Sequence, residues 1–156
     1  MNELLIVSGA FNGGAALPYA SGGVKAGFPS PAQDYMAERL DFDRDLIEHP
    51  DATFYARVIG DSMVGAGISD GDLIVIDKAL EPEDGDIVVA FIDGEFTIKY
   101  LDLTHRQEGY IELVPANTKY KPIRISADDN FTVWGVVAWS IKPRRATSLN
   151  RYTHRP

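Results

Sequence analysis

From residue 53 onward, the hydrophobic positions fall into short runs that are separated by Gly, Asp and Pro. The runs are rich in β-branched and aromatic residues, which is typical of strands. In chain order they read TFYARVI, DLIVID, DIVVAFI, EFTIKYL, YIELVP and FTVWGVVAWSI. The dipeptide Asp93-Gly94, between the third and fourth runs, favours a tight β-hairpin. Short strands with turns this frequent predict a mainly β fold, built as a coiled, barrel-like antiparallel sheet.

The first 50 residues follow a different pattern. Residues 1–27 hold six of the fourteen glycines, and a Gly-rich segment loses much entropy on ordering while offering few large side chains to bury. We therefore expect a flexible N-terminal arm. The stretch FPSPAQDYMAERLDFDRDLIEHP that follows carries helix signals. Ser30 before Pro31 can begin one short helix, and Asp41 can cap a second that ends by Pro50.

Charge is distributed unevenly along the chain, whose net charge is −8. Residues 27–141 carry 22 acidic and nine basic side chains, whereas the last fifteen residues carry five basic side chains and no acidic one. Binding to a phosphate backbone needs clustered Lys and Arg, so we expect no direct DNA binding by the acidic part. The basic tail, residues 143–156, is interpreted as a disordered or partner-seeking end.

Several function classes are excluded by what the sequence lacks. There is no cysteine, and the three histidines have no spacing that indicates shared metal ligation. The glycine motifs that cradle nucleotide phosphates are missing, so we expect neither metal nor cofactor. No apolar run approaches the ~18–20 residues of a membrane span. Glu3 stands where a signal peptide carries a basic residue, so we expect a cytoplasmic protein without a membrane partner.

Two side chains are candidates for chemistry. Ser62, in GDSM, follows one strand-like run and precedes the next. It is either a turn residue or a nucleophile, and a serine needs a base before it can attack. Lys99 is a candidate base, because strand alternation directs it away from the face that Phe96 and Ile98 share. A lysine on a strand is more often a solvated surface residue, so the pattern alone leaves both alternatives open.

Longer stretches of the chain resemble a known family. The pieces AGFPSPAQDY, GDSM, GISDGDLIVID, GDIVVAFIDGEFTIKYL and GVV, in this order and spacing, resemble UmuD-type members of the LexA-type self-cleaving peptidases, the S24 class. The resemblance runs from about Ala26 to about Lys142. It implies a LexA- and signal-peptidase-like β body that contains an SH3-like barrel. The chain then divides into an arm, residues 1–26, that is removed by self-cleavage, a peptidase domain, residues 27–142, and the basic tail.

The resemblance also implies roles for individual residues. Ser62 matches the nucleophile and Lys99 matches the general base. The bond between Ala26 and Gly27 matches the self-cleavage site, and the backbone N–H groups of Asp61 and Ser62 would stabilise the oxyanion. A lysine acts as a base only in its neutral form, which desolvation favours. The small Ala26 and the bendable Gly27 suit a narrow site that the backbone approaches closely.

The family further implies a role in the SOS response. Self-cleavage would be stimulated by a RecA–single-stranded-DNA filament, and the shortened homodimer would join the catalytic subunit of a translesion DNA polymerase. LexA-type repressors carry a DNA-binding domain ahead of the cleavage site, and only 26 residues precede it here, which argues against a repressor. Two rival interpretations stay open. One is a Ser-Lys protease that acts on other proteins, and the other is a non-enzymatic β-barrel binding module.

Overall fold

The computed structural model describes residues 4–7, 15–19, 23–24, 26–27 and 38–145. The chain divides into two compact units, each described here by itself. The larger unit comprises Met1–Gly9 with Ala52–Pro156, and the smaller unit comprises Ala10–Asp51. Among the described residues, no helix has both the length and the apolar character needed to cross a membrane.

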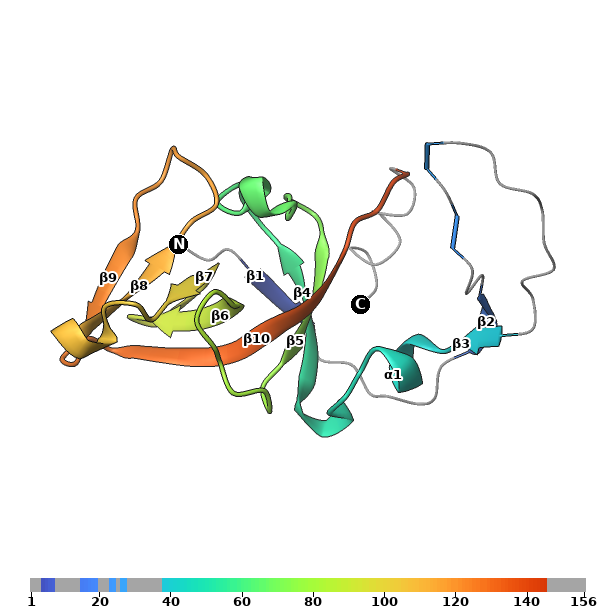
Figure 1. The fold of residues 1–156 in the computed structure, drawn as a ribbon, viewed down its shortest axis with the longest axis horizontal. Coiled ribbons are helices and arrows are strands. Elements are labelled where there is room, and N and C mark those ends of the chain that lie inside the picture. The colour runs from blue at the N-terminus through green and yellow to red at the C-terminus, as the bar shows by residue number, and fades with distance from the viewer. Residues whose placement is uncertain (1–3, 8–14, 20–22, 25, 28–37, 146–156) are drawn as a thin grey trace. The chain divides into compact units, whose positions relative to one another are not determined.

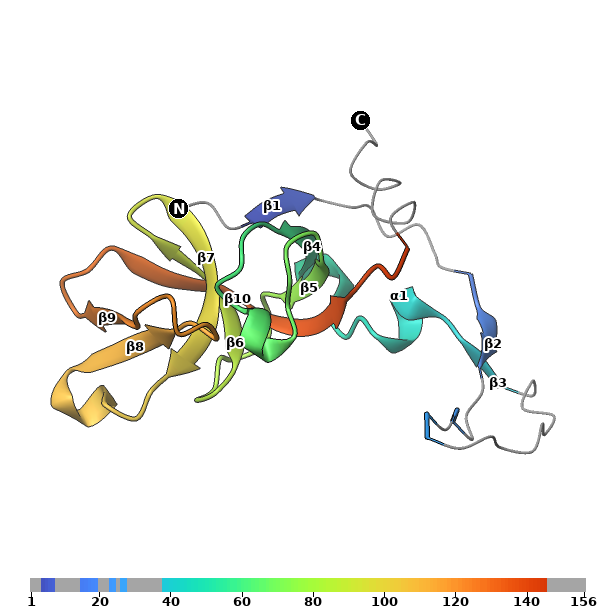
Figure 2. The same cartoon turned by 90° about the horizontal axis from the view of Figure 1, so that it is seen from above.

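The larger unit is an eight-stranded antiparallel sheet (Figures 1 and 2). Its strands are β1 (Leu4–Val7), β4 (Thr53–Val58), β5 (Leu73–Asp77), β6 (Ile87–Ile92), β7 (Glu95–Asp102), β8 (Tyr110–Val114), β9 (Ile123–Ser126) and β10 (Phe131–Ile141). They lie in the order β1-β4-β5-β10-β6-β7-β8-β9. Short 3-10 turns at Val64–Ala66 and Arg106–Glu108 interrupt the loops.

The long strand β10 joins the two halves of this sheet. Its first half pairs with β6 and its second half pairs with β5, and Figure 1 shows it crossing the unit in orange. The register shifts between Val133 and Gly135 and again between Val137 and Trp139. Such bulges bend a strand and increase its twist, which lets one strand serve two partners that point in different directions.

Two apolar clusters form the interior of the larger unit. One is built from β4, β5, β6, β7 and the loop after β4, and includes Ala56, Met63, Ile74 and Ile98. The other lies between β6, β7, β8, β9 and β10, and includes Val88 and Leu113. Ala56, Ile74, Val88 and Leu113 have no exposed surface. Along β6, neighbouring residues alternate between the two clusters, because successive side chains of a strand point to opposite faces.

The smaller unit contains one short two-stranded sheet and one helical turn. Strand β2 (Leu17–Tyr19) pairs with β3 (Glu38–Leu40), and α1 (Phe42–Asp45) follows directly. The side chain of Asp41 accepts hydrogen bonds from the backbone N–H groups of Asp43 and Arg44. Asp41 therefore caps the helix, because it satisfies donors that have no partner inside a helix.

The structure confirms the mainly β fold and all six strands that the hydrophobic runs predict. The tight hairpin is also confirmed, because Asp93 and Gly94 both have positive φ angles, of 48° and 88°, as a two-residue turn requires. The expected cap at Asp41 is observed, although the helix ends at Asp45 and a separate 3-10 turn begins at Pro50.

Other elements differ from the expectation. Strand β3 occupies part of the stretch for which we expected the first helix, and Ser30 and Pro31 lie outside the described residues. The short strand β9 was not predicted, because Arg124 lies inside its four residues. Strand β1 was not predicted either, because the glycine content of residues 1–27 masks the apolar run LLIV within it. Most of the basic tail lies outside the described residues.

Gly135 permits the close contact between β10 and β5. A Cβ atom at this position would lie 2.5 Å from Cγ2 of the fully buried Ile76. We expect Gly135→Ala to lower the free energy of unfolding by about 1–3 kcal/mol, because overpacking forces the strands apart. Thr132→Ala, at an exposed position of the same strand, is the control and should change it by less than about 0.5 kcal/mol. Urea denaturation measures both, and equal stabilities for the two variants would contradict the packing argument.

Candidate active site

Ser62 lies in the loop that follows β4 and leads into the 3-10 turn Val64–Ala66. Gly60 has a φ angle of 98°, which a residue with a Cβ rarely adopts, and this lets the chain turn sharply after the strand. The Gly60 N–H donates to the carboxylate of Asp70 at 2.8 Å, so the start of the loop is fixed. Ser62 is 5% exposed, and the next residue, Met63, is buried in the core.

Lys99 reaches Ser62 from β7, on the other side of β10 in the sheet order. Its Nζ atom lies 3.1 Å from Ser62 Oγ, although 37 residues separate the two in sequence. The side chain is buried, with 4% of its surface exposed. The structure therefore brings these two candidate residues together within hydrogen-bond distance, in the interior of the larger unit.

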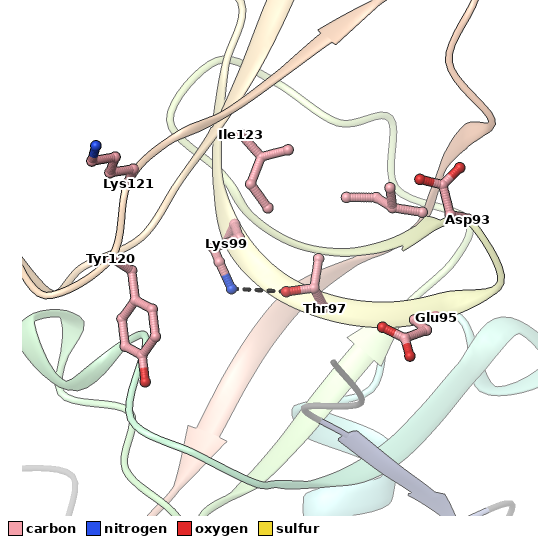
Figure 3. A pocket seen from close by; sticks show the side chains of 8 residues that line it. Asp93, Glu95, Thr97, Lys99, Tyr120, Lys121 and Ile123 are labelled. Atoms are coloured by element: carbon pink, nitrogen blue, oxygen red, sulfur yellow. Dashed lines mark hydrogen bonds between the residues drawn. The ribbon is translucent and has the colours of Figure 1, made fainter.

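Two further oxygens hold the Lys99 amine in place. Nζ donates to Thr97 Oγ1 at 2.7 Å and to the carbonyl of Ile98 at 3.0 Å (Figure 3). With both N–H bonds directed at these acceptors, the lone pair of a neutral amine is left to face Ser62 Oγ. Thr97 was not among the residues singled out from sequence. Its place two residues before Lys99, on the same face of the strand, is the signal that could have identified it.

The loop between β8 and β9 holds the Ser62 loop from the opposite side. The Ala116 N–H donates to the Ser62 carbonyl at 2.8 Å, and the Gly65 N–H donates to the Ala116 carbonyl at 2.7 Å. A Cβ atom on Gly65 would lie 2.5 Å from that carbonyl oxygen. Glycine is therefore required at this position for the two loops to approach so closely.

Asn117 adds a contact that bears on the expected oxyanion donors. Its Nδ2 donates to the Asp61 carbonyl at 2.9 Å, and the Val64 N–H donates to the same oxygen at 3.4 Å. The peptide group that carries this carbonyl also carries the Ser62 N–H, and the group is planar. Fixing the carbonyl therefore fixes the direction of the Ser62 N–H. Nothing in the sequence around Asn117 indicates this long-range contact.

Asp61 is bound by its side chain as well. The Tyr120 hydroxyl donates to Asp61 Oδ1, and Lys119 Nζ lies 3.8 Å from Oδ2. The hydrogen bond from Tyr120, followed by the charge of Lys119, lowers the pKa of Asp61, while the hydrogen bond to Asp61 and burial raise the pKa of Tyr120. Near neutral pH, Asp61 is thus a carboxylate and Tyr120 a neutral donor, which keeps the two loops joined.

A pocket opens beside the Lys99 amine, with a volume of about 340 Å³. Figure 3 shows Tyr120 and Lys121 on one side of Lys99, and Glu95 and Asp93 farther away on the other side. The lining is formed by Ile92, Asp93, Glu95, Thr97, Lys99, Tyr120, Lys121 and Ile123. Its exposed surface is mostly apolar, and Asp93, Glu95 and Lys121 add charged side chains to the lining.

The remaining sequence-predicted site residues lie in the smaller unit. Ala26 and Gly27 are both exposed and occupy a bend. Elsewhere in the larger unit, Asp102, His105 and Glu112 have potential ligand atoms within 4.8 Å of one another. All three are partly exposed, and Asp102 already accepts hydrogen bonds from Thr104. Exposed groups of this kind are common without a metal ion, so we assign no metal site to them.

Comparisons with a family model and with individual proteins indicate the same family. The model of the family described as Peptidase S24-like matches residues 18–138. Protein SamA of Salmonella typhimurium is 47% identical over 122 residues, which cover 78% of this chain and 82% of that protein. Protein MucA of Escherichia coli is 39% identical over 127 residues, covering 81% of this chain and 84% of that protein.

A longer protein also matches. The LexA repressor of Desulfatibacillum aliphaticivorans is 42% identical over 123 residues, which cover 78% of this chain and 59% of the repressor. The match with SamA and MucA, by contrast, extends over most of both proteins. The chain therefore belongs to the Peptidase S24-like family, as a UmuD-type SOS mutagenesis protein.

Proposed function

We propose that this protein cleaves its own chain between Ala26 and Gly27, with Ser62 as nucleophile and Lys99 as general base. The observation that supports the proposal most directly is the 3.1 Å distance between Lys99 Nζ and Ser62 Oγ, with both side chains buried. A solvated surface lysine and a turn serine would not be enclosed in this way. A positioned base within hydrogen-bond reach of a hydroxyl is the geometry that an activated serine requires.

The proposed reaction is an acyl transfer. Neutral Lys99 takes the proton of Ser62 as Oγ bonds to the carbonyl carbon of Ala26, and the carbonyl oxygen becomes an oxyanion. The backbone N–H groups of Asp61 and Ser62 stabilise that charge, which requires donors that are fixed in advance. The bond to the Gly27 nitrogen then breaks, and the Lys99 ammonium returns its proton to the leaving amine. A water molecule, deprotonated by Lys99, then attacks the ester carbonyl carbon. The bond to Ser62 Oγ breaks, and the Lys99 ammonium returns the proton to Oγ.

The contacts around Ser62 support this assignment. The bonds from Ala116 and Asn117 fix the two peptide groups on either side of Ser62. Thr97 and the Ile98 carbonyl fix the amine. Catalysis by positioned groups depends on such fixation, because a displacement of about 1 Å can cost about a hundredfold in rate.

The cellular role that we propose follows from the family. A RecA–single-stranded-DNA filament stimulates cleavage in the cytoplasm. The cleaved homodimer, starting at Gly27, then joins the catalytic subunit of a translesion DNA polymerase. No cofactor is needed, since the reaction uses only side chains and backbone groups of the chain itself.

The first prediction concerns the two catalytic side chains. We expect Ser62→Ala and Lys99→Met each to abolish loss of residues 1–26, because one removes the nucleophile and the other the base. Ser140→Ala and Lys78→Met, at exposed positions of the same unit, are matched controls and should cleave at the normal rate. Intact mass spectrometry after long incubation measures the result. Normal cleavage by Ser62→Ala would show that another nucleophile acts.

The second prediction concerns pH. Lysine side chains titrate near ~10.4 in water, and only the neutral amine accepts a proton. Because the mechanism requires a neutral amine as base, the unstimulated rate should rise with pH, by up to about tenfold per pH unit. A histidine base would level off near ~6.5. The rate is followed by gel between pH 6 and 10, with Lys99→Arg as control, since a guanidinium stays charged. A flat profile, or a rise that persists in Lys99→Arg, contradicts the mechanism.

The third prediction concerns Asn117. We expect Asn117→Ala to slow self-cleavage by about 10- to 100-fold, because the Ser62 N–H is then less well oriented toward the oxyanion. Thr118→Ala, an exposed neighbour in the same loop, should leave the rate unchanged. Cleavage rates are compared at one pH, and thermal unfolding checks that both variants fold. An unchanged rate in a folded Asn117→Ala would refute the positioning role.

A further inference from the structure

Strand β1 closes one edge of the eight-stranded sheet. It pairs with β4 in antiparallel register, from Leu4 opposite Val58 to Val7 opposite Tyr55. Because β1 is the first strand in the sheet order, β4 would be the edge if β1 left. An open edge presents unpaired N–H and C=O groups that can pair with another chain, and proteins usually cover such edges.

Leu4 inserts into the core that supports the candidate active site. Its surface is only 5% exposed. It belongs to the apolar cluster that contains Met63 and Ile98, the sequence neighbours of Ser62 and Lys99. If β1 left, a leucine-sized apolar socket would open at the end of β4, beside a strand edge ready to pair. The two features together form a site that selects an extended segment with an aliphatic side chain at one position.

The chain path makes β1 removable. Strand β1 and the rest of the larger unit, which resumes at Ala52, are joined by a single stretch of chain. Cleavage between Ala26 and Gly27 cuts that stretch. The described contacts that then hold the N-terminal fragment are the four β1–β4 residue pairs, the Leu4 socket and the short pairing of β2 with β3. An intramolecular strand benefits from an effective concentration in the millimolar range. After the cut, the covalent connection is gone and the β2–β3 pairing, of three residue pairs, is what remains of it among the described contacts.

Arg57 adds a polar feature to the same edge. It lies opposite Leu5 in the β1–β4 register. Its Nε atom is buried and has no hydrogen-bond partner among the described residues. Side chains of directly opposed residues on antiparallel strands lie next to each other. A carboxylate at the Leu5 position of an incoming strand would therefore supply an acceptor that leucine cannot.

We propose that the edge of β4 is a strand-docking site, filled by β1 in the uncut chain and taken by an extended segment of a partner protein after cleavage. The segment carries an aliphatic residue in the Leu4 socket and, in the tightest complexes, an acidic residue opposite Arg57. The proposal rests on the proposed cleavage between Ala26 and Gly27, because that cut makes β1 dissociable. It adds to that function a means by which cleavage creates a binding surface.

The test separates this proposal from self-cleavage. The full chain carries Ser62→Ala and the recognition sequence of a site-specific protease between Ala26 and Gly27, so added protease makes the cut whether or not the chain can. Native mass spectrometry then follows the N-terminal fragment through a dilution series. We expect the fragment to stay bound in concentrated samples and to leave on dilution. If the remaining part, which begins at Gly27, unfolds when the fragment leaves, the proposal is overturned, because the site must stay folded to bind a partner.

Fluorescent peptides then probe the emptied site. A peptide of residues 1–9 should bind, and its Leu4→Asp form should bind at least tenfold more weakly. The Leu5→Glu form should bind more tightly than the Leu5→Gln form, which matches it in size without the charge. A peptide of unrelated sequence that keeps an aliphatic residue at the Leu4 position should also bind, and hydrogen exchange at residues 55–58 should slow when it does.

Three binding results would contradict the proposal. If the emptied body binds no peptide, or binds the Leu4→Asp form equally well, the edge of β4 is not a docking site. If only the native sequence binds, the site serves β1 of this chain or of a second copy and not a partner protein. Absence of self-cleavage in the unmodified chain would refute the proposed function while leaving these binding results to stand.

Discussion

The enclosure of the Lys99 amine is the constraint on which the arrangement of the site depends. An amine removed from water must find partners for its N–H groups, because burying them unpaired is costly. Among the described residues, oxygens of Ser62, Thr97 and the Ile98 carbonyl lie within hydrogen-bond distance of it. The Ser62 hydroxyl can accept from an ammonium or donate to a neutral amine. The same three oxygens therefore satisfy Lys99 both before and after it exchanges a proton.

The loop that carries Ser62 lacks regular secondary structure, and contacts with a second loop make it rigid. Loops are ordinarily the mobile parts of a protein. Here the β8–β9 loop binds the Ser62 loop through backbone groups of Ala116, the amide of Asn117 and the hydroxyl of Tyr120. Because Gly65 has no Cβ atom, the backbones come close enough for these bonds. The loop that carries Ser62 is thus held by another loop, which itself connects two strands.

The sequence predicted the strands well because their alternation is local. It also allowed Ser62 and Lys99 to be named through family motifs, but it could not give the distance between them. That distance depends on how β10 places β4 and β7. The role of Thr97 could have been predicted, because it shares a face of β7 with Lys99. Asn117 and Tyr120 could not, because they contact Asp61 from more than fifty residues away in sequence. Strand β1 was not predicted, because the glycine content of residues 1–27 indicates a flexible segment although the short apolar run LLIV lies within it.

The position of β10 in the sheet has a consequence for the order of events during synthesis. The half of the sheet that carries Ser62 and the half that carries Lys99 are hydrogen-bonded to each other through β10. On the ribosome, Ser62 and Lys99 emerge well before residues 131–141, and pairings over such sequence separations form late in folding. A nascent chain with both side chains already exposed lacks the strand that brings them together. The order of synthesis thereby delays the meeting of Ser62 and Lys99 until β10 has been made.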